Sequence, residues 1–439
     1  MATDLVVGLL PEHLLLALVV VLMVLEMLRV ERRWARGAFV AAALAGLAIA
    51  TYQVNTGYTA DVVPGEIHVD RLALNGKLIV LVCGVALGIG FAAQETFKFW
   101  LLVASSMLGA MVIFDSAGFA SLFIGIELMS LPAFALMVHG RGQSAAGEGA
   151  FKYLVLSSVA SALVLFGVSL AYGSTGSLSI AAWAKLLPQG GAPAVAASLL
   201  VLCGLFLKAA VFPFHGWAPD AYASARMPVT ALMASVVKAA VVLALLRIVT
   251  IVPLNAATGI GVAVLAIASI VFGNLAALRQ PRFKRLLAYS SVAHAGYMIF
   301  ALLDTTGNRI DDLLLYTVIY ALGTLLACSS FAALCPGEDD DLSGLDGKFA
   351  RRPVAALLLS LAVLSLAGIP PFPGFFAKLF VFRSVIASGH LVPAVIAFVG
   401  SFLGLAYYLG LVLRLFRTDE HEMNAVPDGT QSSTGQVTA

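Results

Sequence analysis

Long apolar runs recur along this chain, and they constrain its fold more than any other feature of the sequence. A transmembrane helix needs about 20 predominantly apolar residues, whereas a barrel strand needs only about 9–11 alternating ones. The runs here have the length and composition of transmembrane helices. They predict an all-α polytopic membrane protein with about 13 transmembrane helices. Their approximate limits are 12–29, 37–52, 72–95, 97–114, 116–139, 149–174, 194–217, 228–251, 256–278, 286–303, 312–334, 353–385 and 389–413.

The composition excludes other classes of protein. Only 11% of the residues are charged and 61% are hydrophobic, whereas soluble domains carry about 25% charged residues. A net charge of +2 gives no reason to expect a nucleic-acid partner. The four cysteines form no CxxC pair and no spacing typical of zinc or iron–sulfur ligands, so no metal site is expected in this chain.

The distribution of Lys and Arg predicts the orientation in the membrane. The odd-numbered connections between runs and the C-terminal tail carry most of these residues, and cytoplasmic loops are the ones enriched in them. We therefore expect a periplasmic N-terminus and a cytoplasmic C-terminus. The first run lacks the basic flank of a removable signal peptide. The polar tail, 418–439, is rich in Ser, Thr, Gly and Gln and is expected to be disordered.

Four of the ionisable residues inside the apolar runs stand out: Glu127, Lys208, Lys238 and Lys378. A charge at mid-bilayer costs at least ~2.5–3.5 kcal/mol, so such residues are functional candidates. The alternatives are a lysine that snorkels to the interface and an ion pair that only fixes helix packing. Four such charges together favour a polar path through the membrane, and lysines suit a proton path because desolvation readily shifts their pKa.

Three further residues are secondary candidates for the same path. Lys152 begins the sixth run, and an interfacial position is an equal alternative. His215 lies beside a Pro break and titrates near neutral pH, although a hydrogen-bonded His at a broken helix would have the same sequence context. His294 has the polar neighbours Ser290 and Tyr297, and both interpretations remain open for it.

Two segments of the chain resemble each other. KAAVFPFHGW (208–217) and GIPPFPGFFAK (368–378) each combine a Pro-interrupted apolar run, an aromatic residue next to Gly, and an intramembrane Lys. They lie five runs apart, and an odd number of spans gives the two units opposite topologies. Matching interrupted segments in two halves are typical of transporters built from inverted repeats.

At these residues the chain strongly resembles the antiporter-like membrane subunits of respiratory complex I. The resemblance covers roughly 95–415 well and the first three runs more loosely. The motifs that carry it are SLFIGIELMSLPAFALM around Glu127, FKYLVLSS around Lys152, FLKAAVFPFHGWAPDAY around Lys208 and His215, ALMASVVKAA around Lys238, LLAYSSVAHAGYM around His294, and LSLAGIPPFPGFFAKLFVF around Lys378.

The resemblance implies two inverted five-helix repeats, 96–251 and 252–417, each with one broken helix. They would follow three N-terminal helices in 1–95 and precede the tail, 418–439. It implies a proton-translocating subunit that holds no cofactor, with NADH, FMN, iron–sulfur clusters and quinone in partner subunits. The partners would be other membrane subunits of the complex, especially neighbouring antiporter-like subunits, within the lipid bilayer of the bacterial inner membrane.

The resemblance also implies a role for each intramembrane charge. Glu127 would pair with Lys208 at the inner half-channel, Lys238 would be the central relay, and Lys378 would hand the proton to the outer half. The family pattern has fourteen helices, and the last has no counterpart here.

Other functions remain open from the sequence. The alternatives are a subunit of a multisubunit cation/proton antiporter, a subunit of a membrane-bound hydrogenase-type complex, and a scaffold that has lost transport. Retention of all four charges argues against the scaffold.

Overall fold

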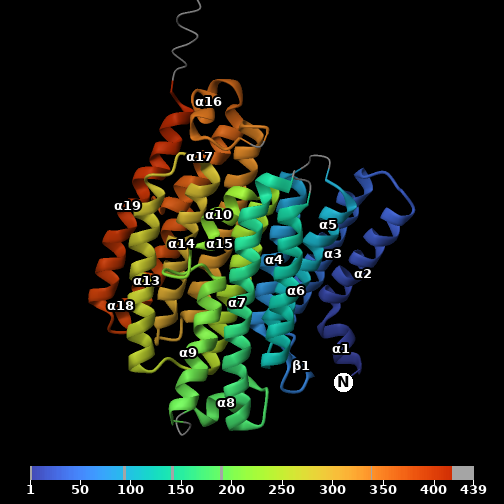
Figure 1. Cartoon of the computed structure of the whole chain (residues 1–439), viewed down its shortest axis with the longest axis vertical. Helices are drawn as coiled ribbons and strands as arrows, with labels where there is room; N and C mark the ends of the chain where they lie inside the picture. Colours follow the sequence, from blue (N-terminus) through green and yellow to red (C-terminus); the bar gives the residue numbers. More distant parts are fainter. Residues whose placement is uncertain (1, 92–94, 140–142, 188–190, 338, 418–439) are drawn as a thin grey trace, which may run out of the picture.

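The computed structural model describes residues 2–91, 95–139, 143–187, 191–337 and 339–417, and the predicted disordered tail lies outside them. The described part is almost entirely helical (Figure 1). In chain order its elements are α1 (Ala2–Gly8), α2 (Leu10–Met27), α3 (Arg33–Asn55), β1 (Ala60–Val63), β2 (Ile67–Val69), α4 (Arg71–Gly90), α5 (Phe97–Asp115), α6 (Phe119–Val138), α7 (Gln143–Thr175), α8 (Ile180–Leu186), α9 (Gly191–Lys208), α10 (Trp217–Ser224), α11 (Met227–Leu232), η1 (Met233–Val237), α12 (Lys238–Ile251), α13 (Ala256–Ala277), α14 (Phe283–Phe300), η2 (Ala301–Leu303), α15 (Arg309–Leu334), η3 (Leu342–Leu345), α16 (Lys348–Arg351), α17 (Pro353–Ala367), α18 (Pro373–Ala387) and α19 (Leu391–Leu415).

The predicted fold class is confirmed. Twelve helices of the described chain are long and apolar enough to cross a membrane. The remaining predicted run, 353–385, is divided into α17 and α18, as its prolines suggested. Gly368 ends α17 with φ +82°, a left-handed conformation that glycine adopts without steric cost, and Pro373 begins α18. The chain is a multi-pass membrane protein.

Polar side chains fix where several helices begin. Asp70, Thr96 and Asn255 precede α4, α5 and α13, and each accepts a hydrogen bond from a backbone N–H in the first turn. These bonds satisfy donors that a helix leaves free at its N-terminus. The sequence therefore sets both the apolar length of these helices and the residue at which each one starts.

Two features differ from the simple pattern of apolar runs. Residues 56–70 contain a short antiparallel hairpin, β1–β2, whose strands are too brief to give an alternating pattern in the sequence. Helix α7 begins at Gln143, before the predicted limit at 149, and a short additional helix, α8, follows it. Both features lie in connections, where hydropathy does not define the structure.

One helical segment lies inside the molecule, covered by the other helices. Residues 229–249 of the segment Met227–Ile251, which comprises α11, η1 and α12, are all buried within the molecule, and α14 is nearly so. A helix that is apolar on every face is expected at such a position. In Figure 1, α2 to α5 lie toward the right of the molecule, and α13, α17, α18 and α19 lie toward the left.

The two interrupted helices run in opposite directions. The α9–α10 pair begins near the end of the molecule that carries α8, whereas the α17–α18 pair begins near the end that carries α16 (Figure 1). Residues 209–216 separate the first pair and residues 368–372 the second, and each interruption contains a cis X–Pro bond, Phe212–Pro213 and Pro370–Pro371. Backbone groups inside the bundle are therefore left without helical partners at two places.

Candidate functional site

Glu127 and Lys208 face each other across α6 and α9. Glu127 lies in the middle of α6, and Lys208 is the last residue of α9. The Lys208 Nζ is 3.9 Å from the Glu127 Oε1, and the carboxylate is 29% exposed while the lysine is buried. This distance is beyond a direct hydrogen bond. The pair is therefore an ion pair with room for a small change in separation.

Three serines contact one or the other of the two charges. Lys208 Nζ donates to the hydroxyl oxygens of Ser157, at 2.9 Å, and Ser130, at 3.3 Å. Ser161 donates to the Glu127 carboxylate. A hydroxyl both donates and accepts, so these side chains can pass a proton between groups that do not touch. The sequence analysis did not identify them, although Ser157 and Ser161 lie one helical turn apart on α7, a spacing that was visible.

Lys238 occupies the centre of the buried segment. Its Nζ donates to the carbonyl oxygens of Ala209, at 2.5 Å, and Ser291, at 3.3 Å. Ala209 directly follows α9, so the lysine binds backbone that the helix break has freed. The π-helical turn η1 ends immediately before Lys238, and such turns are frequent at functional sites. Within the described residues no carboxylate forms an ion pair with Lys238.

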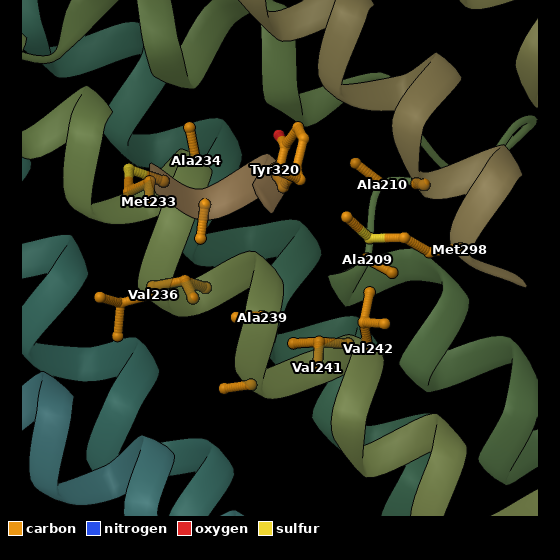
Figure 2. Close-up of a cluster of buried hydrophobic side chains, with 14 of the residues drawn as sticks. Ala209, Ala210, Met233, Ala234, Val236, Ala239, Val241, Val242, Met298 and Tyr320 are labelled. Carbon is orange, nitrogen blue, oxygen red and sulfur yellow. The ribbon is translucent and has the colours of Figure 1, made fainter. Parts of the chain in front are cut away.

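Apolar side chains surround this position. Figure 2 shows Val236, Ala239, Val241 and Val242 along η1 and α12, with Met298 from α14 opposite them. All five are buried. An ammonium group placed here has little to stabilise it apart from the two carbonyl oxygens.

Lys378 lies at the second helix break in an equivalent setting. Its Nζ donates to the Ala367 carbonyl oxygen at 2.8 Å and lies 4.8 Å above the ring of Tyr297. A Cβ on Gly368 would lie 2.9 Å from the lysine side chain, so the close approach also requires glycine there. A carbonyl dipole and an aromatic face are both favourable partners for a cation.

Hydroxyl groups surround His294 on α14. The same helix carries the groups that contact Lys238 and Lys378. The His294 Nδ1 is 2.9 Å from the Tyr316 hydroxyl, and its Nε2 is 3.3 Å from the Tyr408 hydroxyl. Tyr408 is also hydrogen-bonded to Ser290. Helix α14 therefore supplies the Ser291 carbonyl to Lys238, a histidine network, and the Tyr297 ring under Lys378. The sequence analysis named Tyr297 but missed Tyr316 and Tyr408, because an apolar run tolerates Tyr without any visible anomaly.

Lys152 and His215 lie outside this hydrogen-bonded set. Lys152 is 41% exposed, and its Nζ lies 2.7 Å from Asp220 and 2.7 Å from Glu148. His215 is stacked on Phe212 and packs against Phe272. Its Nδ1 has no hydrogen-bond partner among the described residues. The geometry thus favours the interfacial interpretation of Lys152.

Other buried charges are paired across the fold. Arg247 forms a bidentate ion pair with Asp70 at 2.8 and 3.1 Å. Arg226 pairs with Glu95 in the same way. Lys77 lies inside α4 and is completely buried. The sequence analysis had no signal for its partners, which come from other helices.

Comparison with known families supports these observations. The family model described as NADH:quinone oxidoreductase/Mrp antiporter, TM, matches residues 116–404, well over half of the chain. The chain belongs to this family. The matched region includes all seven residues that the sequence singled out.

Individual members of the family are similar to this chain over most or nearly all of its length. NADH-quinone oxidoreductase subunit N of Pelobacter propionicus is 56% identical over 98% of this chain and 93% of its own length. NADH-quinone oxidoreductase subunit 14 of Thermus thermophilus is 38% identical over 86% of this chain and 84% of its own length.

Solved structures agree with the sequence relatives. A chain of respiratory complex I from Thermus thermophilus with bound aureothin superposes with a TM-score of 0.83 and 34% identity, covering 93% of this chain and 90% of that chain. A chain of the Mrp complex from Dietzia has a TM-score of 0.85 at 23% identity, covering 95% of this chain and 81% of that chain, and shares the fold.

Proposed function

We propose that this chain is a proton-translocating membrane subunit of an NADH-quinone oxidoreductase. Protons move through its intramembrane Glu, Lys and His residues, driven by quinone reduction in other subunits. The observation that carries the proposal is the placement of three buried lysines at or beside the two helix breaks, in a chain 56% identical to a subunit N. The enzyme is the whole complex, and no redox chemistry is assigned to this chain.

The first step of the path is the loading of Lys208. Two unit charges 4 Å apart attract each other by about 4 kcal/mol at an effective dielectric constant of 20, and by about 2 kcal/mol at 8 Å. Small movements of α6 relative to α9 therefore change the stability of the ammonium form of Lys208. Glu127 is the more exposed member of the pair and is placed to exchange protons with water.

The following steps use Lys238 and Lys378. Desolvation disfavours a charged amine unless a counter-charge compensates for it. Both lysines have backbone carbonyl partners and lack a carboxylate ion pair within the described residues. His294 lies on α14, the helix that contacts both lysines, and its two tyrosine partners come from α15 and α19. We assign these three residues the transfer between the two lysines.

The surroundings of the chain follow from the same assignment. NADH, FMN, iron–sulfur clusters and quinone are placed in partner subunits, and the immediate partners are neighbouring antiporter-like membrane subunits. The complex lies in the bacterial inner membrane, with the N-terminus of this chain periplasmic and its C-terminus cytoplasmic. Residues 96–251 and 252–417 form the two inverted repeats, and the opposite directions of the broken helices support this division.

The decisive experiment measures protons pumped per electron in the assembled complex carrying Lys238→Ala. Pumping is expected to fall strongly, because the central amine is lost. Lys98→Ala is the matched control, since Lys98 is 65% exposed and pairs only loosely with Glu26, at 3.5 Å. Normal pumping by Lys238→Ala would overturn the proposal.

A further inference from the structure

A second group of buried charges lies among the N-terminal helices, separate from the proposed path. The Lys77 Nζ is 2.8 Å from the Glu12 Oε1 of α2 and 3.0 Å from the Asp115 Oδ2 of α5. It also donates to the Gly8 carbonyl oxygen, at 3.4 Å, at the end of α1. Lys77 is 0% exposed, and the side chains of Glu12 and Asp115 are 7% and 2% exposed. Three helices thus bring one amine and two carboxyl groups together away from solvent, and α1 adds a backbone carbonyl oxygen.

The contacts of Lys77 fit an ammonium group. An ammonium has three N–H donors and no acceptor, and three acceptors from three different helices surround the Nζ. With both carboxyl groups ionised, however, the group would carry a net charge of −1. An uncompensated buried charge costs several kcal/mol. Asp115 is in addition the last residue of α5, where the helix dipole disfavours a negative charge.

Among the described residues, no second cation forms an ion pair with Glu12 or Asp115. Three basic side chains of the neighbouring elements pair elsewhere: Arg247 with Asp70, Arg71 with Asp311, and His68 with Asp61.

Three other titratable side chains lie near this end of α1 and α2. Asp4 of α1 is acidic and cannot neutralise a carboxylate. The Tyr58 hydroxyl, which lies close to Gly8, and the His13 Nδ1 have no hydrogen-bond partner among the described residues. The excess negative charge is therefore removed most simply by a proton on one carboxyl group.

We propose that Glu12, Lys77 and Asp115 form a proton-binding site. Lys77 and one carboxylate are ionised, and the two carboxyl groups share a single exchangeable proton at neutral pH. Release breaks the carboxyl O–H bond, transfers the proton to water and leaves a second carboxylate beside Lys77. Glu12 is the third residue of α2 and Asp115 the last of α5, so the site exchanges its proton at the end of the molecule that carries β1 and β2.

The test detects the protonated carboxyl group directly. The full chain is placed in lipid nanodiscs, and infrared difference spectra are recorded as the pH is changed. The wild-type chain is expected to show at pH 7 a carbonyl band of a protonated carboxyl group. The band should disappear in both Glu12→Gln and Asp115→Asn, because each amide leaves one carboxylate balanced against Lys77. The amides match the shape of the protonated acid, so both variants are expected to fold.

Two controls assign the band. Asp311→Asn removes a carboxylate that pairs with Arg71 on the exposed surface and should leave the band unchanged. Glu127→Gln should also leave it unchanged, which distinguishes this site from the proposed path. A wild-type chain without the band, or a band that persists in either Glu12→Gln or Asp115→Asn, would overturn the proposal. The spectra require no turnover, so the result does not depend on whether the complex pumps protons.

Discussion

Lys77 and Lys238 are both buried amines in transmembrane helices, yet their surroundings are opposite. Lys77 lies within 3.0 Å of two carboxyl groups, whereas Lys238 contacts two backbone carbonyl oxygens. A counter-charge stabilises a buried ammonium, and an apolar setting with only dipoles favours the neutral amine. The partners therefore favour a permanent ion at Lys77 and a releasable proton at Lys238, the role proposed for it. Burial alone does not distinguish the two.

Replacement of Lys238 by arginine is expected to give the largest effect. Arginine keeps the positive charge but is effectively never deprotonated in proteins. Pumping per electron should therefore fall to nearly the level of Lys238→Ala in the assembled complex. Lys98→Arg, at an exposed position, should pump normally. Full pumping by Lys238→Arg would show that no releasable proton is needed at this position.

Removal of the amine should affect folding differently at the two sites. Lys77→Met leaves the carboxyl pair without its cation and should lower the free energy of unfolding by ~3–5 kcal/mol. Lys238→Met leaves only carbonyl groups unpartnered and should cost ~1–3 kcal/mol. Denaturant titration in detergent measures both values.

A double variant sharpens this difference. Adding Asp115→Asn to Lys77→Met should recover part of the lost stability, since one buried acid is removed together with the cation. Equal losses for Lys77→Met and Lys238→Met, or no recovery in the double variant, would remove the distinction between the two sites.

The surroundings of Lys208 are intermediate between those of Lys77 and Lys238. The Glu127 carboxylate lies 3.9 Å from the Lys208 Nζ, and the Nζ donates hydrogen bonds to two serine hydroxyls. If Glu127 controls the charge of Lys208, Glu127→Gln and Lys208→Ala abolish the same step of proton transfer. The double variant should then pump hardly less than the more impaired single variant. Protons per electron measured for all three complexes test this coupling. Losses that simply add, or normal pumping by Glu127→Gln, would leave the pair as a structural ion pair.

The smallest effect is expected at Lys152, whose carboxylate partners are at the surface. Exposed ion pairs contribute ~0.2–1 kcal/mol each. Lys152→Gln should therefore change the free energy of unfolding by about that amount and leave pumping near the wild-type level. A loss of pumping comparable to that of Lys238→Ala would place Lys152 in the path and contradict the interfacial interpretation.

The sequence predicted the helices and the intramembrane charges because both can be recognised locally. A long apolar run differs from the composition of a soluble domain, and a charge differs from the apolar run around it. Long apolar runs are visible residue by residue, and Lys238 stands out within one. The two helix breaks were equally visible from Pro213 and Pro371. The proposed path roles of these charges remain predictions, since the geometry supports them without testing transport.

Contacts between distant segments could not be predicted in this way. Arg247 and Asp70 lie 177 positions apart, and nothing local joins them. Glu12 and Asp115 stand at the ends of apolar runs, where a charge is ordinary, so the group around Lys77 could only emerge from packing. Tyr316 and Tyr408 are compatible with an apolar run, and their polar role depends entirely on facing His294.

The contact between Lys238 and the Ala209 carbonyl has a mechanical consequence. Hydrogen bonds from a charged donor are roughly twice as strong as those between neutral groups. Loss of the Lys238 proton would therefore weaken the hydrogen bond between α12 and the end of α9, and reprotonation would strengthen it. Coupling of this kind is reciprocal. A movement of the broken helix away from Lys238 would lower the proton affinity of the amine. The same contact can therefore turn helix movement into proton release, and proton release into helix movement.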